Sequence, residues 1–221
     1  MSIDTRAAQR PNIGEMYVIH RVFRREFTAI PALVRRVRDG DVPRAKIVGS
    51  HLQLILAGLH MHHTGEDEVL WPRLLQRAAP STELVETMQS QHERVDEYAD
   101  QIEPLVESWL TSASAVRGEQ LARLVDDFAV ALFEHLELEE REVLPLISEH
   151  ITVAEWDSLA DHGRDSMTTR TLPLMFGSIL EDADAGERAS MRGALPPPVR
   201  LLMKTIGARQ YRRYISRVRA V

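Results

Sequence analysis

Apolar residues recur at intervals of three and four along most of the chain, which is the spacing of helices that bury one face. We expect four long helices, at about 14–38, at 44–77, between Ser81 and Thr111, and at 116–149. Pro31 should kink or split the first helix. Pro72 should remove the hydrogen bond to the carbonyl of Glu68 and loosen the second. The pattern predicts an all-α protein.

A histidine and a glutamate four residues apart lie on two of these predicted helices. The second helix contains His62 and Glu66, and the fourth contains His135 and Glu139. Four residues turn an α-helix by about 400°, so each pair lies one turn apart on one face. An imidazole and a carboxylate side by side make half of a site for a divalent metal ion.

Two further histidines complete an internal repeat. His20 precedes the first motif and His92 precedes the second at nearly the same distance, and each lies in the apolar stripe of its helix. Four separate core histidines would each need a hydrogen-bond acceptor in an apolar interior. A four-helix bundle, in contrast, can hold two metal ions with ligands from all its helices. The predicted metal ligands are His20, His62, Glu66, His92, His135 and Glu139.

The repeat resembles the hemerythrin-like, or HHE cation-binding, family over about residues 12–148. Its two copies end in Val-Leu-Trp-Pro and Val-Leu-Pro, and each is preceded by a spaced histidine. The resemblance implies an up-down-up-down four-helix bundle that holds a non-haem di-iron centre, oxo- or hydroxo-bridged, with Glu66 and Glu139 bridging the two irons. Residues 149–221 would form a helical C-terminal extension. Iron rests on the resemblance, because a His/Glu site also accepts manganese or zinc.

The chain departs from the oxygen-carrying members of that family at two places. Met88 stands one turn before His92, where those members have a further histidine. The fourth helix has His-x-x-x-Glu, where those members have His-x-x-x-x-Asp. We therefore expect at least one nitrogen ligand fewer, and coordination positions open to water, peroxide, oxygen or nitric oxide. This argues against simple reversible oxygen carriage.

Neighbouring histidines are assigned outside the ligand set by helical geometry. His63 is turned by about 100° from His62 and His60 by about 200°, so both should point away from the site. His51 is nearly on the face of His62, but it lies about 16 Å along the axis and cannot reach the same metal pair.

Three other polar residues also lie near the predicted ligands. Asp67 and Glu140 lie about 100° further round than the ligand glutamates and should contact solvent or support the ligands. Tyr17, one turn before His20, should pack in the core with a wetted hydroxyl, or approach the site as a ligand or hydrogen-bond donor.

Composition narrows the possible chemistry. The 221 residues include nine histidines and no cysteine, which excludes disulfides, thiol redox chemistry, iron–sulfur clusters and Cys-bound zinc. No run of about 18 apolar residues is present, so we expect no membrane span. Residues 1–11 lack a signal-peptide core, and we predict a cytoplasmic location.

Charge is distributed unevenly along the chain, whose net charge is −6. No acidic residue follows Val199, but seven basic residues do: Arg200, Lys204, Arg209, Arg212, Arg213, Arg217 and Arg219. Such asymmetry indicates an interaction made by the tail. We expect a basic amphipathic helix that docks on an acidic bundle, and no nucleic-acid partner. Before it, a capping box at Thr152 and Glu155 should open a short fifth helix.

The residues and the resemblance together favour a non-haem di-iron protein that acts on a small oxygen or nitrogen species. Within that class we favour decomposition of hydrogen peroxide and a role in oxidative stress. The alternative is a protein that binds or senses oxygen, nitric oxide or iron without turnover, and a third is a metal-free helical interaction module. The sequence identifies neither the catalytic residues, the natural substrate nor the oligomeric state.

Overall fold

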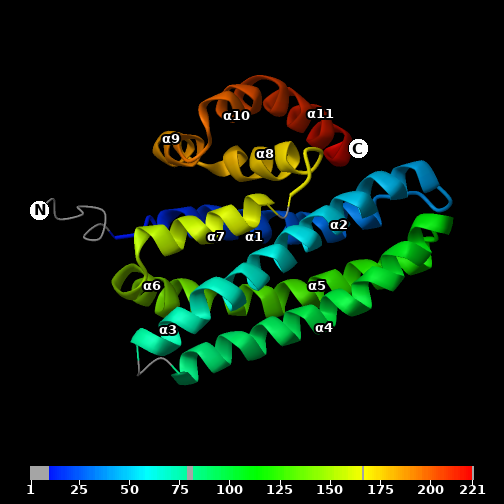
Figure 1. The fold of residues 1–221 in the computed structure, drawn as a ribbon. Coiled ribbons are helices and arrows are strands. Elements are labelled where there is room, and N and C mark those ends of the chain that lie inside the picture. The colour runs from blue at the N-terminus through cyan, green and yellow to red at the C-terminus, as the bar shows by residue number, and fades with distance from the viewer. Residues whose placement is uncertain (1–9, 79–81, 166, 221) are drawn as a thin grey trace, which may run out of the picture.

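The computed structural model describes residues 10–78, 82–165 and 167–220, and every regular element in these ranges is a helix. The four long helices are α1 (Gly14–Arg35), α2 (Val42–Gly65), α4 (Thr82–Ser112) and α5 (Ala115–Leu138). Helices α1 and α4 each pack against both α2 and α5, as Figure 1 shows. The predicted all-α class is confirmed. The break expected at 79–81 lies outside the described residues.

Helix α1 runs unbroken through Pro31, so the predicted split does not occur. Phe27, Ile30 and Val34 on the same stripe are almost fully buried, and this burial outweighs the one backbone hydrogen bond that proline removes. Gly40, with φ of 78°, forms the turn after α1. The Asp41 side chain then caps α2 by accepting a bond from the next turn's backbone.

Helices α2 and α5 both change their winding where the predicted ligand glutamate begins a π-turn. The turn η2 (Glu66–Leu70) leads into α3 (Trp71–Arg77), and η4 (Glu139–Val143) leads into α6 (Leu144–His150). The Trp71 N–H donates to the carbonyl of Glu66, five residues back, and Leu144 does the same to Glu139. The loosening expected at Pro72 therefore takes the form of a π-turn, a feature common at functional sites.

The two largest apolar clusters among the described residues lie on either side of the predicted ligands. The larger cluster includes, about one turn from the ligands, Phe23, Leu59, Val95 and Leu132. The smaller cluster includes, about one turn from the ligands on the opposite side, Met16, Leu70, Met88 and Val143. The ligands therefore form one polar layer that is closed above and below by apolar side chains.

The C-terminal part folds back over the long helices, as Figure 1 shows. Its elements are α7 (Val153–Asp165), α8 (Leu172–Asp182), α9 (Ala185–Gly193), α10 (Pro197–Leu202), η5 (Met203–Gly207) and α11 (Ala208–Arg219). Helix α7 packs on α2, while α8 and α9 pack on α1. Thr152 and Glu155 make the reciprocal bonds of the predicted capping box. Within the described ranges, no helix is both long and apolar enough to cross a membrane.

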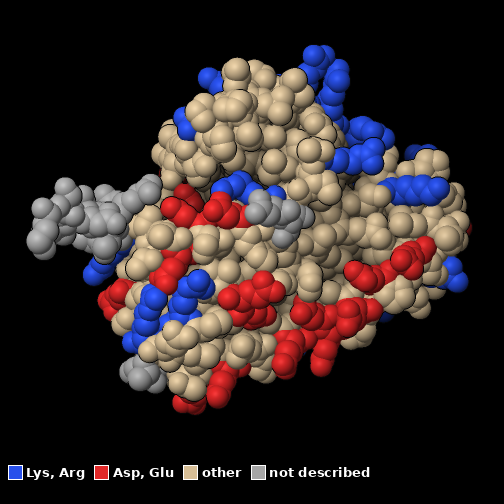
Figure 2. Space-filling view, viewed as in Figure 1, with Lys and Arg blue, Asp and Glu red and all other residues tan. Residues whose placement is uncertain are grey.

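The basic tail helix α11 lies on α2 and α8. It buries Tyr211, Ile215 and Val218 in the larger core cluster, and Arg219 makes ion pairs with Glu26 and Glu181. Figure 2 shows basic side chains at the upper right of the molecule and acidic ones gathered below. The predicted docking of the tail is confirmed, and both its apolar face and its ion pairs take part.

Candidate metal centre

The six predicted ligands lie together in the polar layer. Among the described residues, two groups bring their ligand atoms within 4.8 Å of one another. One group comprises His20, His62, Glu66 and Glu139, and the other comprises His63, His92 and His135. All seven side chains are buried, and His62 is the most exposed residue of the set at 8%. The helical repeat therefore predicted correctly which distant segments meet.

Each glutamate faces one histidine of its own helix and one from another helix. Glu66 Oε1 lies 3.4 Å from His62 Nε2, and its Oε2 lies 3.4 Å from His92 Nε2. Glu139 Oε2 lies 3.2 Å from His20 Nε2 and 3.8 Å from the Nε2 of His135. The two carboxylates therefore lie where the two groups of ligand atoms adjoin.

Many of these buried atoms lack a hydrogen bond from any described residue. They include both carboxylate oxygens of Glu66 and of Glu139, and the Nε2 atoms of His92 and His135. His20 and His62 direct their Nε2 atoms at each other across 3.3 Å. Burying so many polar atoms without partners is costly. Divalent cations fit this set of imidazole nitrogens and carboxylate oxygens, which suits iron, manganese or zinc.

Asp67 and Glu140, the two acids expected outside the ligand set, contact the Nδ1 atoms of two predicted ligand histidines. Glu140 Oε1 lies 2.9 Å from His20 Nδ1 and also accepts a bond of 2.6 Å from Arg24. Asp67 Oδ1 lies 3.0 Å from His92 Nδ1. Such carboxylates fix the ring orientation and the tautomer of a metal-binding histidine. Each acid directly follows a predicted ligand glutamate, so one short motif supplies both the ligand and the support.

The charges inside the layer shift the pKa values in opposite directions. Burial lowers the pKa of His20, but Glu139 and Glu140 more than offset this and raise it to about 9. Burial and the neighbouring Glu139 charge raise the pKa of Glu66 to about 8. Burial lowers the pKa of His135 to about 3. Without a cation the layer thus retains protons at neutral pH, and metal binding must release them.

The prediction that His63 points away from the site is wrong. The His63 side chain is buried, and its ring stacks on that of His92 with centroids 4.0 Å apart and an interplanar angle of 9°. The His135 ring lies 5.0 Å away. The side of α2 that faces the polar layer lies between the directions of His62 and His63. The turn of about 100° from one residue to the next therefore places the two rings on either side of the layer. The adjacent histidines were the signal that could have revealed this.

His63 also breaks the symmetry of the repeat, because Leu136 occupies the equivalent position after His135. It brings the number of imidazoles in the layer to five. Met88 is fully buried in the smaller apolar cluster. The expected shortage of a nitrogen ligand therefore does not follow from Met88, because His63 offers another imidazole.

The remaining polar residues lie elsewhere. Tyr17 is 36% exposed, and its hydroxyl donates to the backbone carbonyl of Glu140 at 3.3 Å, so it enters neither the core nor the ligand groups. His60 is exposed, as expected. His51 is buried, with Glu26 and the hydroxyl of Tyr214 as its partners.

Comparisons with known proteins agree with this geometry. No curated protein and no solved structure matches the chain. A family model described as the Hemerythrin HHE cation binding domain matches residues 12–147, which is the segment that contains every member of the two ligand groups. The chain belongs to the hemerythrin family of HHE cation-binding proteins.

Proposed function

We propose that this chain is a non-haem di-iron protein that acts on a small oxygen or nitrogen species, and that hydrogen peroxide is the favoured substrate. The observation that carries the proposal is the pair of adjoining groups of buried, unpartnered ligand atoms. Two groups call for two ions, and the glutamates between them can bridge. The proposed ligands are His20, His62, Glu66, His92, His135 and Glu139, with His63 added.

The fold in this proposal is an up-down-up-down four-helix bundle over residues 12–148, with a helical extension over 149–221. Each long helix contacts two others. In four-helix bundles, short connections join antiparallel neighbours, and ligands project inward from facing helices. A cytoplasmic location and a role in oxidative stress stay predictions.

Iron held at this site would supply the redox chemistry that peroxide decomposition requires. The chain's own residues hold the ligands and exclude water. Asp67 and Glu140 fix the rings of His92 and His20 from behind. The apolar clusters on both sides of the layer keep bulk solvent away from the buried carboxylates, which strengthens their interaction with a bound cation.

A second function, binding or sensing of oxygen, nitric oxide or iron without turnover, is favoured by His63. A fifth imidazole against His92 and His135 crowds one side of the site. A crowded pair of ions leaves fewer positions for a substrate that must bind across both. The two functions differ in whether peroxide is consumed.

The test combines metal analysis with turnover. We expect two iron ions per chain in the purified protein, and an oxygen electrode should record oxygen release on addition of hydrogen peroxide. His63→Leu, which copies the residue at 136, should turn over peroxide faster if crowding limits access. A stable oxygen complex of the reduced protein together with no oxygen release would replace the enzyme with the binding protein. Protein without bound metal would contradict both.

A further inference from the structure

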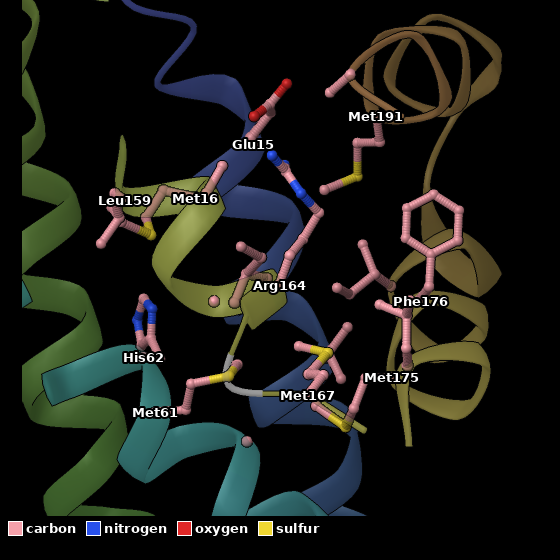
Figure 3. Close-up of a pocket in the computed structure, with 18 of the residues that line it drawn as sticks. Glu15, Met16, Met61, His62, Leu159, Arg164, Met167, Met175, Phe176 and Met191 are labelled. Atoms are coloured by element: carbon pink, nitrogen blue, oxygen red, sulfur yellow. The ribbon is translucent and has the colours of Figure 1, made fainter. Parts of the chain in front are cut away.

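A cavity of about 180 Å³ lies between the long helices and the C-terminal extension. Helices α1, α2, α7, α8 and α9 contribute to its wall, and Figure 3 shows their side chains converging on it. The wall is almost wholly apolar, and it includes five of the eight methionines in the chain: Met16, Met61, Met167, Met175 and Met191. Methionine is flexible and polarisable, so such a wall adapts to different apolar shapes.

The cavity reaches the metal centre at one residue, His62. Its Nε2 faces Glu66 and His20 inside the polar layer. The Nδ1 atoms of the other three repeat histidines have partners, which are Glu140 for His20, Asp67 for His92 and Gln91 for His135. Among the described residues, none bonds to Nδ1 of His62. The ring is more than nine-tenths buried, so this nitrogen can find a partner only through the cavity.

We propose that this cavity binds an aliphatic carboxylate of medium chain length, whose carboxylate accepts a hydrogen bond from His62 Nδ1–H. The hydrocarbon chain lies among the methionines. The bound carboxylate then stands behind His62 as Glu140 stands behind His20. The inference rests on the proposed function in one respect, because a metal ion on Nε2 keeps the ring proton on Nδ1.

The size of the cavity suits a chain of medium length. A dry apolar cavity of about 150 Å³ holds benzene, and this cavity of about 180 Å³ is partly open to solvent, so a flexible hydrocarbon chain such as that of decanoate can extend along its wall. A free polar molecule such as hydrogen peroxide gains little from an apolar wall, whereas each buried methylene contributes about 0.8 kcal/mol.

The charges at the other end of the cavity favour this orientation. Arg164 lines that end, but so does the carboxylate of Glu15. Arg164 also makes an ion pair with Asp161. An anion placed there would meet two acids for one guanidinium. At the inner end it would meet the N–H of His62, and the cations that the layer would hold offset the charge of Glu66, which lies 3.4 Å from His62 Nε2.

Gly163 offers a way to fill the cavity without disturbing its wall. A Cβ at this position meets only the end of Met61, at 3.9 Å. The variant Gly163→Leu therefore places a side chain in the space of the ligand. Gly193, where a Cβ meets nothing within 4 Å, lies outside the cavity wall, and Gly193→Leu is the matched control.

The experiment is calorimetric titration of the purified full chain with sodium decanoate. We expect saturable binding of one decanoate per protein molecule. The affinity should be roughly tenfold or more weaker in Gly163→Leu, because the leucine side chain occupies the place of the hydrocarbon chain. Affinity should be unchanged in Gly193→Leu. Circular dichroism confirms that both variants fold. No saturable binding to the natural chain, or equal binding by folded Gly163→Leu, would overturn the proposal.

Two further arms test the position of the head group. Decanol should bind roughly tenfold or more weaker than decanoate, because it lacks the charge that strengthens the bond to His62. Arg164→Gln should leave decanoate affinity nearly unchanged. Equal binding of decanol, or a loss in Arg164→Gln as large as that in Gly163→Leu, would remove His62 as the partner. Decanoate binding by a protein that holds no iron or ignores peroxide would contradict the proposed function and leave the cavity site standing.

Discussion

Among the described residues, two buried clusters combine histidine with glutamate, one between α1 and α2 and the other across all four long helices, and they are built in opposite ways. Glu26 of α1 lies against His51 of α2, with Glu26 Oε2 and His51 Nε2 3.1 Å apart. Arg25 donates to Glu26 at 2.6 Å, and the Nδ1 atom of His51 lies 2.9 Å from the Tyr214 hydroxyl. Glu66 of the metal centre is equally buried, but accepts no hydrogen bond from any described residue.

The difference shows in the charge that each carboxylate prefers. Burial raises the pKa of Glu26, but His51 and Arg25 more than offset this and lower it to about 2. Burial and Glu139 raise the pKa of Glu66 to about 8. Arg25 compensates the charge of Glu26, whereas Glu66 lies beside a second buried carboxylate, Glu139. Burial of a His–Glu pair does not by itself indicate a metal site, and the absence of protein partners is the feature that makes the Glu66 cluster a candidate.

The largest expected effect is loss of bound metal when the carboxylate of Glu66 or Glu139 is removed. Glu66→Ala and Glu139→Ala should abolish binding of two ions, because each removes the acid that adjoins both ligand groups. Asp67→Ala and Glu140→Ala are the matched controls, and they should retain both ions with affinity lowered by about 10–100-fold. Metal analysis after dialysis against a competing chelator measures both. Retention of two ions by Glu66→Ala would show that the ligands are assigned wrongly.

Next in size is the effect of Glu26→Ala. This change leaves the buried His51 without its acid and removes one partner of the partly buried Arg25. It should lower the free energy of unfolding by about 3–5 kcal/mol. Metal content should not change. Glu119→Ala, at an exposed pair with Arg35, is the control and should leave stability nearly unaltered. Urea titration gives the free energies, and loss of metal in Glu26→Ala would erase the distinction between the clusters.

The pH dependence of stability should differ between metal-free and metal-bound protein. His20 has a pKa raised to about 9 in the folded metal-free layer, so its stabilising contribution is complete below about pH 6.5 and is lost as the pH rises to about 9. The loss from His20 alone is on the order of 3 kcal/mol. Bound metal replaces the proton and should flatten the curve. Thermal melts from pH 6 to 9 would contradict this if both forms responded alike.

A smaller effect, with opposite signs in the two forms, is expected for His63→Leu. Both ring nitrogens of His63 are buried without a partner, so an apolar side chain of similar size should stabilise the metal-free protein by about 1–3 kcal/mol. The same change should weaken metal binding if His63 is a ligand. Melting curves with and without chelator measure both. Destabilisation of the metal-free form would mean that His63 has a structural role.

The smallest effect is expected for Tyr214→Phe, which deletes the hydroxyl beside His51. The free energy of unfolding should fall by about 1 kcal/mol, with metal content unchanged. Tyr98→Phe, at a tyrosine packed on Phe128, is the matched control. An effect of Tyr214→Phe on metal content would mean that the two clusters communicate along α2.

The sequence predicted the helices, and it predicted that six candidate ligands come together, because helical spacing fixes which residues share a face and the internal repeat indicates which faces meet. The prediction for His63 was wrong because α2 is rotated so that both His62 and His63 reach the polar layer. Packing against other helices sets this rotation of α2 about its axis. Helix α2 is buried on more than one side, since α7 and α11 cover it as well as the other long helices. The cavity beside His62 is likewise created by chain segments distant in sequence, and no local pattern indicated it.

The two clusters become complete at different stages of translation. Every member of the two ligand groups lies between His20 and Glu139, while the partners of Glu26 and His51 include Tyr214 and Arg219 on α11. Chains are made from the N-terminus, and structural units fold as they emerge. The ligand layer can therefore assemble on the ribosome before α11 exists. A metal ion present during translation can therefore reach His62 before α7 to α9 cover it.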